Sequence, residues 1–230
     1  MKNQWFGDIN DYYKYGLLRL ITKNTSLKVG ICWMLTKNDG RNPDTKYLSQ
    51  PENWRRYDSN LYDFLRHLVI NCDKHDIIQI ENNEILPACQ FHSVTLIDDK
   101  EARQQYFSNF KHLVQACDLL FFDADNGMEV KSKPYGREHS SKYLYWYEAK
   151  ELYDLGYSLL IFQYHRRVKY EDFIKSLSNE FAANIGVKPQ YFYRTKHVTL
   201  LLIAQSKHRA IFQKLNKAIK ANWPKQIQVL

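Results

Sequence analysis

Cysteine, proline and glycine are scarce in this chain of 230 residues, which has four, six and eight of them. The cysteines stand at positions 32, 72, 89 and 117 and form no Cys-x-x-Cys pair. That spacing argues against a zinc site and against a disulfide framework. We therefore expect four free and buried thiols in a reducing cytoplasm.

Long apolar runs are absent as well. No stretch approaches the roughly 18–20 apolar residues of a membrane helix. The opening, Met1 to Phe6, lacks the apolar core of a signal peptide. We expect a cytoplasmic protein with no membrane partner. Neither G-x-G-x-x-G nor G-x-x-x-x-G-K occurs, so the sequence does not support nucleotide binding by those two loops.

Basic and aromatic residues, by contrast, are plentiful. Lysine and arginine number 33 against 25 acidic residues, which gives a formal net charge of +8. The chain also holds 17 tyrosines, 12 phenylalanines and 5 tryptophans. A basic surface with interleaved rings suits phosphate contacts and base stacking, and it predicts nucleic acid, RNA or DNA, as the partner. The alternative is a basic protein whose rings pack the core. The oligomeric state stays open.

Helices and strands alternate along the chain. Helical periodicity predicts helices over 12–21, 61–69, 100–116, 140–155, 170–181 and 207–221. Short apolar runs predict strands over 27–35, 77–80, 93–97, 118–123, 158–163, 191–193 and 198–204. This order predicts one α/β domain over 1–230 that opens with a helical segment to about residue 25. We expect a mostly parallel sheet, helices on both faces and a C-terminal antiparallel hairpin.

In such sheets ligands bind at the carboxyl ends of the strands, near the point where the strand order reverses. Three strand ends therefore come into question, at 33–38, 123–127 and 163–166. The strongest candidate is Asp123-Ala124-Asp125-Asn126-Gly127, because an apolar strand delivers two acids to the sheet edge. Carboxylates there can hold a substrate amine, bind a metal or act as a base. The alternative is a plain Asp-Asn-Gly turn.

Three further segments could take part. Asp11 and Lys14 share one face at the start of the first helix, and the alternative is a capped helix with a surface ion pair. The basic loop over 131–142 ends in Ser140 and Ser141 at a predicted helix start, which suits a phosphate. The segment over 163–167 could place cations on a nucleic-acid backbone. Each of the last two could equally be structural or solvated.

Two of these segments resemble motifs of a known enzyme class. Gly7 to Lys14 has the pattern G-x-x-x-D-x-x-K and resembles the N-terminal motif of bacterial ribosomal RNA adenine methyltransferases of the RlmJ type. In that class this segment borders the pocket for S-adenosylmethionine and the target base. The aspartate of a D-P-P-Y tip holds the exocyclic amine of adenine, and Asp123 to Asn126 stand in the comparable place. The whole chain resembles more closely a poorly characterised bacterial family marked by FGDxxDYxKYGLLR and FFDxDNG.

The resemblance implies a Rossmann-like, methyltransferase-like fold, S-adenosylmethionine as cofactor, and a protein that acts on or binds nucleic acid. It implies acceptor-side roles for Asp123, Asp125 and Asn126. It implies that Gly7, Asp8, Asp11 and Lys14 line the cofactor side. Asn126 stands where that class has an aromatic ring to stack on the flipped base. This departure favours the alternative of a non-catalytic nucleic-acid-binding protein, so the sequence does not decide whether the chain is an enzyme.

A second alternative is a metal-dependent nuclease. Asp123 or Asp125 is followed by Glu129 and Lys131, which form a Glu-x-Lys pattern after an aspartate. In such sites two carboxylates hold magnesium and a lysine positions water. Outside that alternative the sequence predicts no metal site.

Overall fold

A seven-stranded sheet forms the centre of the molecule in the computed structural model, which describes residues 1–230. Its strand order is β2-β1-β3-β4-β6-β5-β7. The strands are β1 (Val29–Cys32), β2 (Cys89–His92), β3 (Leu119–Phe122), β4 (Ser158–Tyr164), β5 (Tyr191–Arg194), β6 (Val198–Ile203) and β7 (Gln228–Val229). An α/β fold is therefore confirmed.

The prediction of a mostly parallel sheet is wrong, because the sheet is mixed. The pairs β1–β2, β1–β3 and β3–β4 are parallel. The pairs β4–β6, β5–β6 and β5–β7 are antiparallel. Only residues 195–197 join β5 to β6, and so short a connection forces neighbouring strands to run antiparallel. This pair is the expected C-terminal hairpin.

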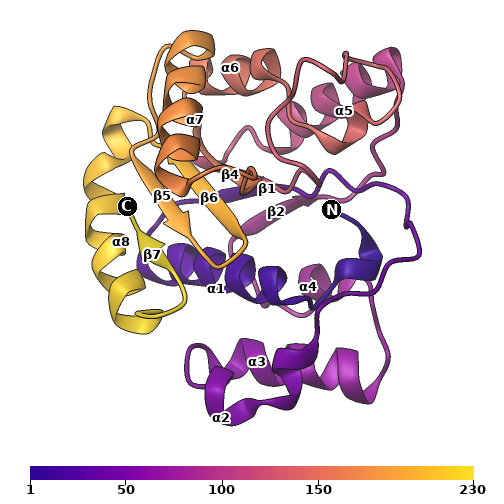
Figure 1. Cartoon of the computed structure of the whole chain (residues 1–230), viewed down its shortest axis with the longest axis vertical. Coiled ribbons are helices and arrows are strands. Elements are labelled where there is room, and N and C mark those ends of the chain that lie inside the picture. The colour runs from indigo at the N-terminus through magenta and orange to yellow at the C-terminus, as the bar shows by residue number, and fades with distance from the viewer.

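Helices cover both faces of the sheet (Figure 1). They are α1 (Ile9–Asn24), α2 (Pro51–Trp54), α3 (Ser59–Arg66), α4 (Ile78–Asn82), α5 (Lys100–Leu113), α6 (Trp146–Asp154), α7 (Tyr170–Asn184) and α8 (Arg209–Asn222). Short turns of other helix types are η1 (Asn3–Trp5), η2 (Lys46–Ser49), η3 (His67–Asn71), η4 (Ser140–Lys142) and η5 (Ser206–His208).

Two apolar clusters hold these layers together. Side chains of a strand alternate between faces, so Leu119 and Phe121 enter one cluster while Leu120 and Phe122 enter the other. The first cluster joins the sheet to α1, α3 and α8, and the second joins it to α5, α6 and α7. Both faces of β3 are thus buried, which explains its unbroken apolar sequence.

Some sequence predictions failed at the edge of the sheet. The segment predicted as a strand over 77–80 lies at the start of α4, because Ile77 and Ile80 are three residues apart and bury one helical face. The strand at this edge of the sheet, next to β1, is β2. It is half exposed and carries Gln90 and His92, so it has no apolar run. The helix predicted from residue 140 begins at Trp146, after η4.

The structure also bears on two expectations, about the thiols and about membrane helices. All four thiols are free, as expected, but Cys72 is exposed and Cys89 is partly buried, so only Cys32 and Cys117 are buried. None of the helices has both the length and the apolar character that crossing a bilayer requires.

The contact between α1 and Trp223 provides a test of the packing. A Cβ on Gly16 would lie 2.2 Å from Cζ2 of Trp223, whose ring is 1% exposed. We expect Gly16→Ala to lower the free energy of unfolding by about 1–3 kcal/mol through overpacking, despite the better helix propensity of alanine. Urea denaturation measures this, with exposed Lys23→Ala on the same helix as control. A Gly16→Ala protein as stable as the control would contradict the packing.

Candidate functional site

The first turn of α1 is closed by its own acidic side chains. Asp8 is the N-cap, and its Oδ1 accepts a hydrogen bond from the backbone N–H of Asp11 at 2.8 Å. Gly7 has φ +80° and donates its N–H to Asp11 Oδ2 at 3.0 Å. The Tyr15 hydroxyl donates to the same oxygen at 3.0 Å. A Cβ on Gly7 would lie 2.5 Å from Val69, so this turn requires glycine.

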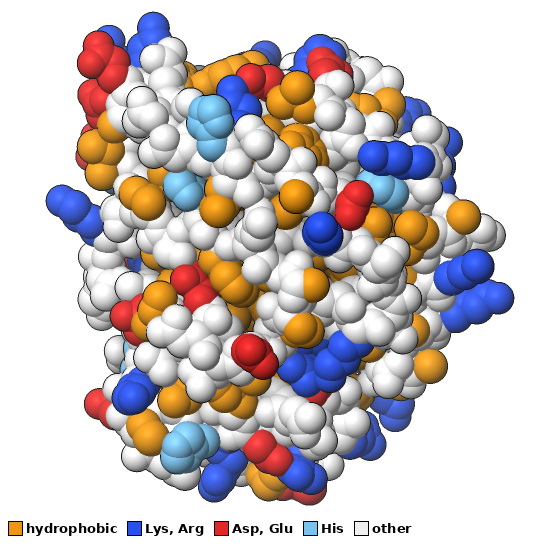
Figure 2. All heavy atoms as spheres, turned by 180° about the vertical axis from the view of Figure 1, so that it is seen from behind, with side chains coloured by type: hydrophobic (Ala, Val, Ile, Leu, Met, Phe, Trp, Pro, Cys, Tyr) orange, Lys and Arg blue, Asp and Glu red, His pale blue; other side chains and the backbone are white.

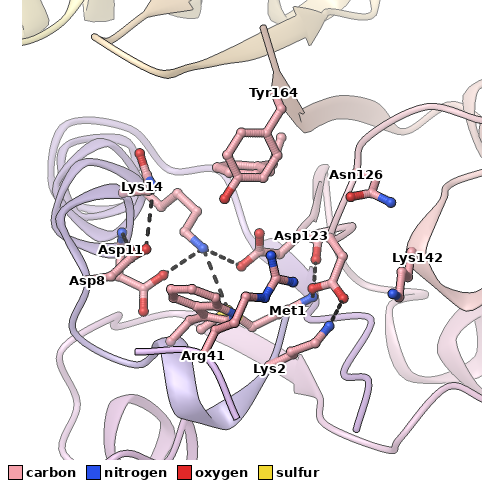
Figure 3. Close-up of a pocket in the computed structure, with 14 residues that line it drawn as sticks. Met1, Lys2, Asp8, Asp11, Lys14, Arg41, Asp123, Asn126, Lys142 and Tyr164 are labelled. Carbon is pink, nitrogen blue, oxygen red and sulfur yellow. Dashed lines mark hydrogen bonds and ion pairs between the residues drawn. The ribbon is translucent and has the colours of Figure 1, made fainter. Parts of the chain in front are cut away.

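Lys14 joins this turn to the end of β3. Its Nζ lies 2.7 Å from Asp11 Oδ1 and 2.6 Å from Asp123 Oδ2 (Figure 3). Nζ also lies 4.9 Å from the centre of the Phe162 ring. All three charged side chains are at most 3% exposed. The two segments that the sequence singled out first therefore meet in one place.

A cavity of about 340 Å³ opens beside this contact. It lies at the carboxyl ends of β3 and β4, next to β1, where the strand order reverses. Of the residues that the sequence singled out, Gly7 is not part of its wall. The wall consists of Met1, Lys2, Trp5, Asp8, Asn10, Asp11, Lys14, Arg41, Asp123, Asp125, Asn126, Lys142, Phe162 and Tyr164.

One carboxylate oxygen of Asp123 is free to accept a hydrogen bond in this cavity. Its Oδ2 is taken by Lys14. Its Oδ1 has no hydrogen-bond partner, although the residue is only 2% exposed and lines the cavity. Because Oδ1 faces the cavity and accepts no hydrogen bond within the protein, it is open to a ligand that donates a hydrogen bond there.

Burial sets the protonation of the acids around Lys14. Desolvation, together with the charge of Asp11, raises the pKa of Asp8 to about 7. Desolvation also raises the pKa of Asp11, although the Lys14 ammonium opposes it. Burial alone would lower the pKa of Lys14, but Asp11 and Asp123 outweigh it and raise that pKa above its usual range. Lys14 therefore stays charged, and the pKa of Asp8, which forms no ion pair with Lys14, lies near neutral pH.

Asp125 is committed to contacts within the protein. Its Oδ1 lies 2.8 Å from the α-ammonium of Met1, and its Oδ2 pairs with Lys2 and accepts a hydrogen bond from Thr36 at 2.7 Å. Burial raises the pKa of Asp125, but the Met1 ammonium and Lys2 outweigh it and hold that pKa well below its usual range. Both its oxygens are partnered, so it has no spare acceptor for a ligand.

Asn126 and Gly127 form a turn at the edge of the cavity. Gly127 has φ +84°, and a Cβ there would lie 2.2 Å from Gln163 Oε1. That oxygen accepts from the Met128 N–H at 2.8 Å, and Gln163 Nε2 donates to the Asn126 carbonyl at 3.3 Å. Gln163 thus fixes the Asn-Gly turn, while the exposed side chain of Asn126 lies at the cavity rim.

The basic loop over 131–142 is fixed at its end by a buried ion pair. Arg103 Nε lies 2.6 Å from Glu148 Oε1, and both side chains are nearly inaccessible. The same guanidinium donates to the carbonyls of Ser140 and Tyr143 at 3.0 and 2.6 Å. These bonds hold η4 in place and bring Lys142 to the cavity.

The predicted phosphate seat at the serines is already filled. Asp98 accepts hydrogen bonds from the backbone N–H groups of His139 and Ser141, both at 2.7 Å. The interpretation of this loop end as a phosphate site is therefore wrong, because the chain supplies its own carboxylate there.

Only part of the segment over 163–167 faces the cavity. Tyr164 lines it. Arg166 instead pairs with Glu180 on α7 at 2.6 Å, and His165 contacts the Thr199 hydroxyl at 2.9 Å. These two side chains stabilise the hairpin side of the sheet.

The E-x-K arrangement does not assemble. Glu129 Oε2 accepts from the Trp146 N–H at 3.1 Å, Lys131 is exposed, and neither residue lines the cavity. No group of three or more His, Cys, Asp or Glu side chains is placed to hold a metal ion. The geometry therefore does not favour the nuclease alternative.

Sequence reasoning missed several wall residues. Phe162 lies inside a strand, and Arg41 lies in a polar loop that carries no motif. Lys2 and Trp5 belong to the aromatic opening, which has no periodicity to place it. Arg41 lies 5.6 Å from the Trp5 ring, a pairing that the sequence does not signal.

No protein-family model, curated protein or solved structure that we compared matches this chain.

The Lys14 contacts predict a large and pH-dependent effect on stability. Lys14→Met leaves Asp11 and Asp123 buried without a cation, which costs about 3–5 kcal/mol of unfolding free energy at pH 7. The loss should shrink at pH 5, because the pKa of Asp11 is raised by burial and its protonation removes the repulsion. Urea denaturation at both pH values measures it.

Lys111→Met is the matched control, because Lys111 pairs with Glu151 on the surface. We expect it to change stability by less than about 1 kcal/mol. Equal effects of the two substitutions would contradict the buried role of Lys14.

Proposed function

We propose that this protein binds single-stranded or locally opened nucleic acid by taking one base into the cavity at the end of β3, on a Rossmann-like, methyltransferase-like frame. The observation that carries the proposal is Oδ1 of Asp123, which has no partner within the protein and belongs to a residue that lines a cavity with aromatic residues in its wall. An exocyclic amine donates to such an oxygen, as the resemblance implies for this aspartate.

The frame is supported by the position of the cavity. The chain passes from β1 to β2 on one side and continues to β3 on the other, so the strand order reverses at β1. Open α/β sheets bind ligands at that point, outside the carboxyl ends of the strands. Asp123 follows β3 directly there.

The walls and rim suit a nucleotide. The exposed ring of Tyr164 and the half-buried ring of Trp5 offer surface for a base, and the buried ring of Phe162 adds apolar wall. Lys142 offers positive charge at the cavity, and so does the exposed Arg41, although Arg41 also pairs with Asp39. On the face shown in Figure 2, acidic and basic side chains are interspersed and form no basic patch. The proposal therefore rests on the cavity and its rim rather than on a broad basic surface.

Methyl transfer is the second candidate, because Asp123 and the segment of Asp11 and Lys14 meet as the resemblance implies. Two observations argue against S-adenosylmethionine beside a base. The Met1 nitrogen donates to the carbonyls of Asp123 at 2.8 Å and Met34 at 3.2 Å, so the N-terminus lies between the segments that follow β1 and β3. The cavity that is left is near the lower end of the roughly 300–1,000 Å³ range for one ligand. We therefore favour binding over transfer.

Asp123→Asn tests the binding proposal. We expect the amide oxygen to stay on Lys14, which turns the NH₂ group toward the cavity, where it repels a base amine. The affinity for a single-stranded oligo(A) should fall about tenfold to a hundredfold, measured by fluorescence anisotropy.

Asp118→Asn is the matched control, because Asp118 lies at the opposite end of the same strand and accepts the Lys28 N–H at 3.0 Å. It should bind oligo(A) as the unmodified protein does. Equal affinities of both variants, with folding verified by circular dichroism, would remove Asp123 from the site.

A thermal-shift measurement separates the two candidates. A ligand at about a hundred times its Kd adds about 2.7 kcal/mol to stability, which raises the Tm of a chain of this size by about 5–10 °C. We expect S-adenosylmethionine to leave the Tm unchanged and oligo(A) to raise it. A rise with S-adenosylmethionine would favour methyl transfer.

A further inference from the structure

We propose that Asp8 is a second residue that recognises the bound base. As a neutral carboxylic acid it donates a hydrogen bond to a ring nitrogen of the base. The cavity therefore selects adenine or cytosine. This inference rests on the proposed function and goes beyond the amine contact of Asp123. It assigns to Asp8 a role in specificity rather than a place beside a cofactor.

The geometry leaves one oxygen of Asp8 for this task. The residue is 7% exposed and lines the same cavity as Asp123. Its Oδ1 already accepts the Asp11 N–H at 2.8 Å. Its Oδ2 has only a long contact of 3.4 Å with Asn10 Nδ2. A proton on Asp8 therefore belongs on Oδ2, which is free to donate it to a ligand.

The charges around the cavity floor favour that proton. Asp8, Asp11 and Asp123 line the cavity, and Lys14 forms ion pairs with the last two only. The titratable groups that interact with Asp8 include Asp11 and Lys14 on α1, Tyr164 on β4 and Tyr47 on η2. Asp123 and Arg41 line the same cavity. Burial and the Asp11 carboxylate raise the pKa of Asp8 to about 7.

A donor at Asp8 and an acceptor at Asp123 Oδ1 in the same cavity match one kind of Watson–Crick base edge. Adenine presents an amine donor next to a ring nitrogen acceptor, and cytosine presents the same pair. Uracil presents a carbonyl oxygen and a ring N–H, so both contacts would be mismatched. A matched pair of hydrogen bonds discriminates bases by about 1–3 kcal/mol, which is about tenfold or more in affinity.

The affinity for the base should fall as the pH rises, because only the protonated form of Asp8 donates the hydrogen bond. The fraction of protonated Asp8 falls as the pH rises through its pKa, and the apparent affinity falls with it. We expect oligo(A) and oligo(C) to bind about tenfold more weakly at pH 8 than at pH 6. Oligo(U) should bind at least about tenfold more weakly than oligo(A) at pH 6.

The experiment uses tetranucleotides with hydroxyl ends, because their phosphodiesters do not titrate in this range, and follows binding by calorimetry from pH 6 to 8. Asp8→Asn is the decisive variant: asparagine caps a helix as well as aspartate, and its amide donates at every pH. It should bind oligo(A) with an affinity that does not change with pH. None of the chain's eight histidines lines the cavity, so histidine titration does not account for a slope that this variant abolishes.

Two results would overturn the protonated role of Asp8 while the proposed function stands. One is binding of oligo(A) that depends on Asp123 but not on pH, and the other is an unchanged pH slope in folded Asp8→Asn. Oligo(U) binding as tightly as oligo(A) would also reject the base selection. If no tetranucleotide binds at any pH, the proposed function fails and this inference fails with it.

Discussion

The ammonium of Lys14, held between Asp11 and Asp123, is the interaction on which the candidate site depends. It joins the first turn of α1 to the end of β3 across 109 positions of sequence. Buried ion pairs add little net stability, because desolvation offsets the attraction, but breaking one is costly. The contact therefore fixes geometry more than it stabilises the fold. It keeps the acidic tip and the helix turn on the same side of one cavity.

The contacts of the Lys14 ammonium determine which carboxylate oxygens of the cavity remain free for a ligand. Lys14 occupies one oxygen of Asp123 and leaves the other facing the cavity. It forms an ion pair with Asp11 but none with Asp8, whose pKa burial and the Asp11 charge raise to about 7. Asp125, the other acid of the tip, is neutralised by Met1 and Lys2. One acceptor and one acid thus remain for a ligand, although four aspartates line the cavity.

Much of this arrangement could be predicted from the sequence, because it depends on local patterns and one topological rule. The apolar run of β3 indicates a strand buried on both faces, and strands of an α/β sheet deliver their ends to one edge. The meeting of Asp123 with Lys14 follows from that rule together with the start of α1. The resemblance to adenine methyltransferases and the cofactor it implies stay predictions.

Other features depend on contacts that no local pattern carries. Asp98 fills the turn before η4 from a distant segment, so the serines look free in the sequence. The edge strand β2 is half exposed and therefore lacks an apolar signal. Arg41 and Trp5 reach the cavity only through tertiary packing. The antiparallel half of the sheet was underestimated because the direction of β6 depends on a short connection rather than on its composition.

A crystal structure of the protein with a bound oligo(A) tests the central claim most directly. The account predicts one adenine inside the cavity, with its exocyclic amine about 2.7–3.2 Å from Asp123 Oδ1 and Lys14 still bonded to Oδ2. An oligonucleotide bound elsewhere on the surface, with the cavity empty of any base, would contradict it.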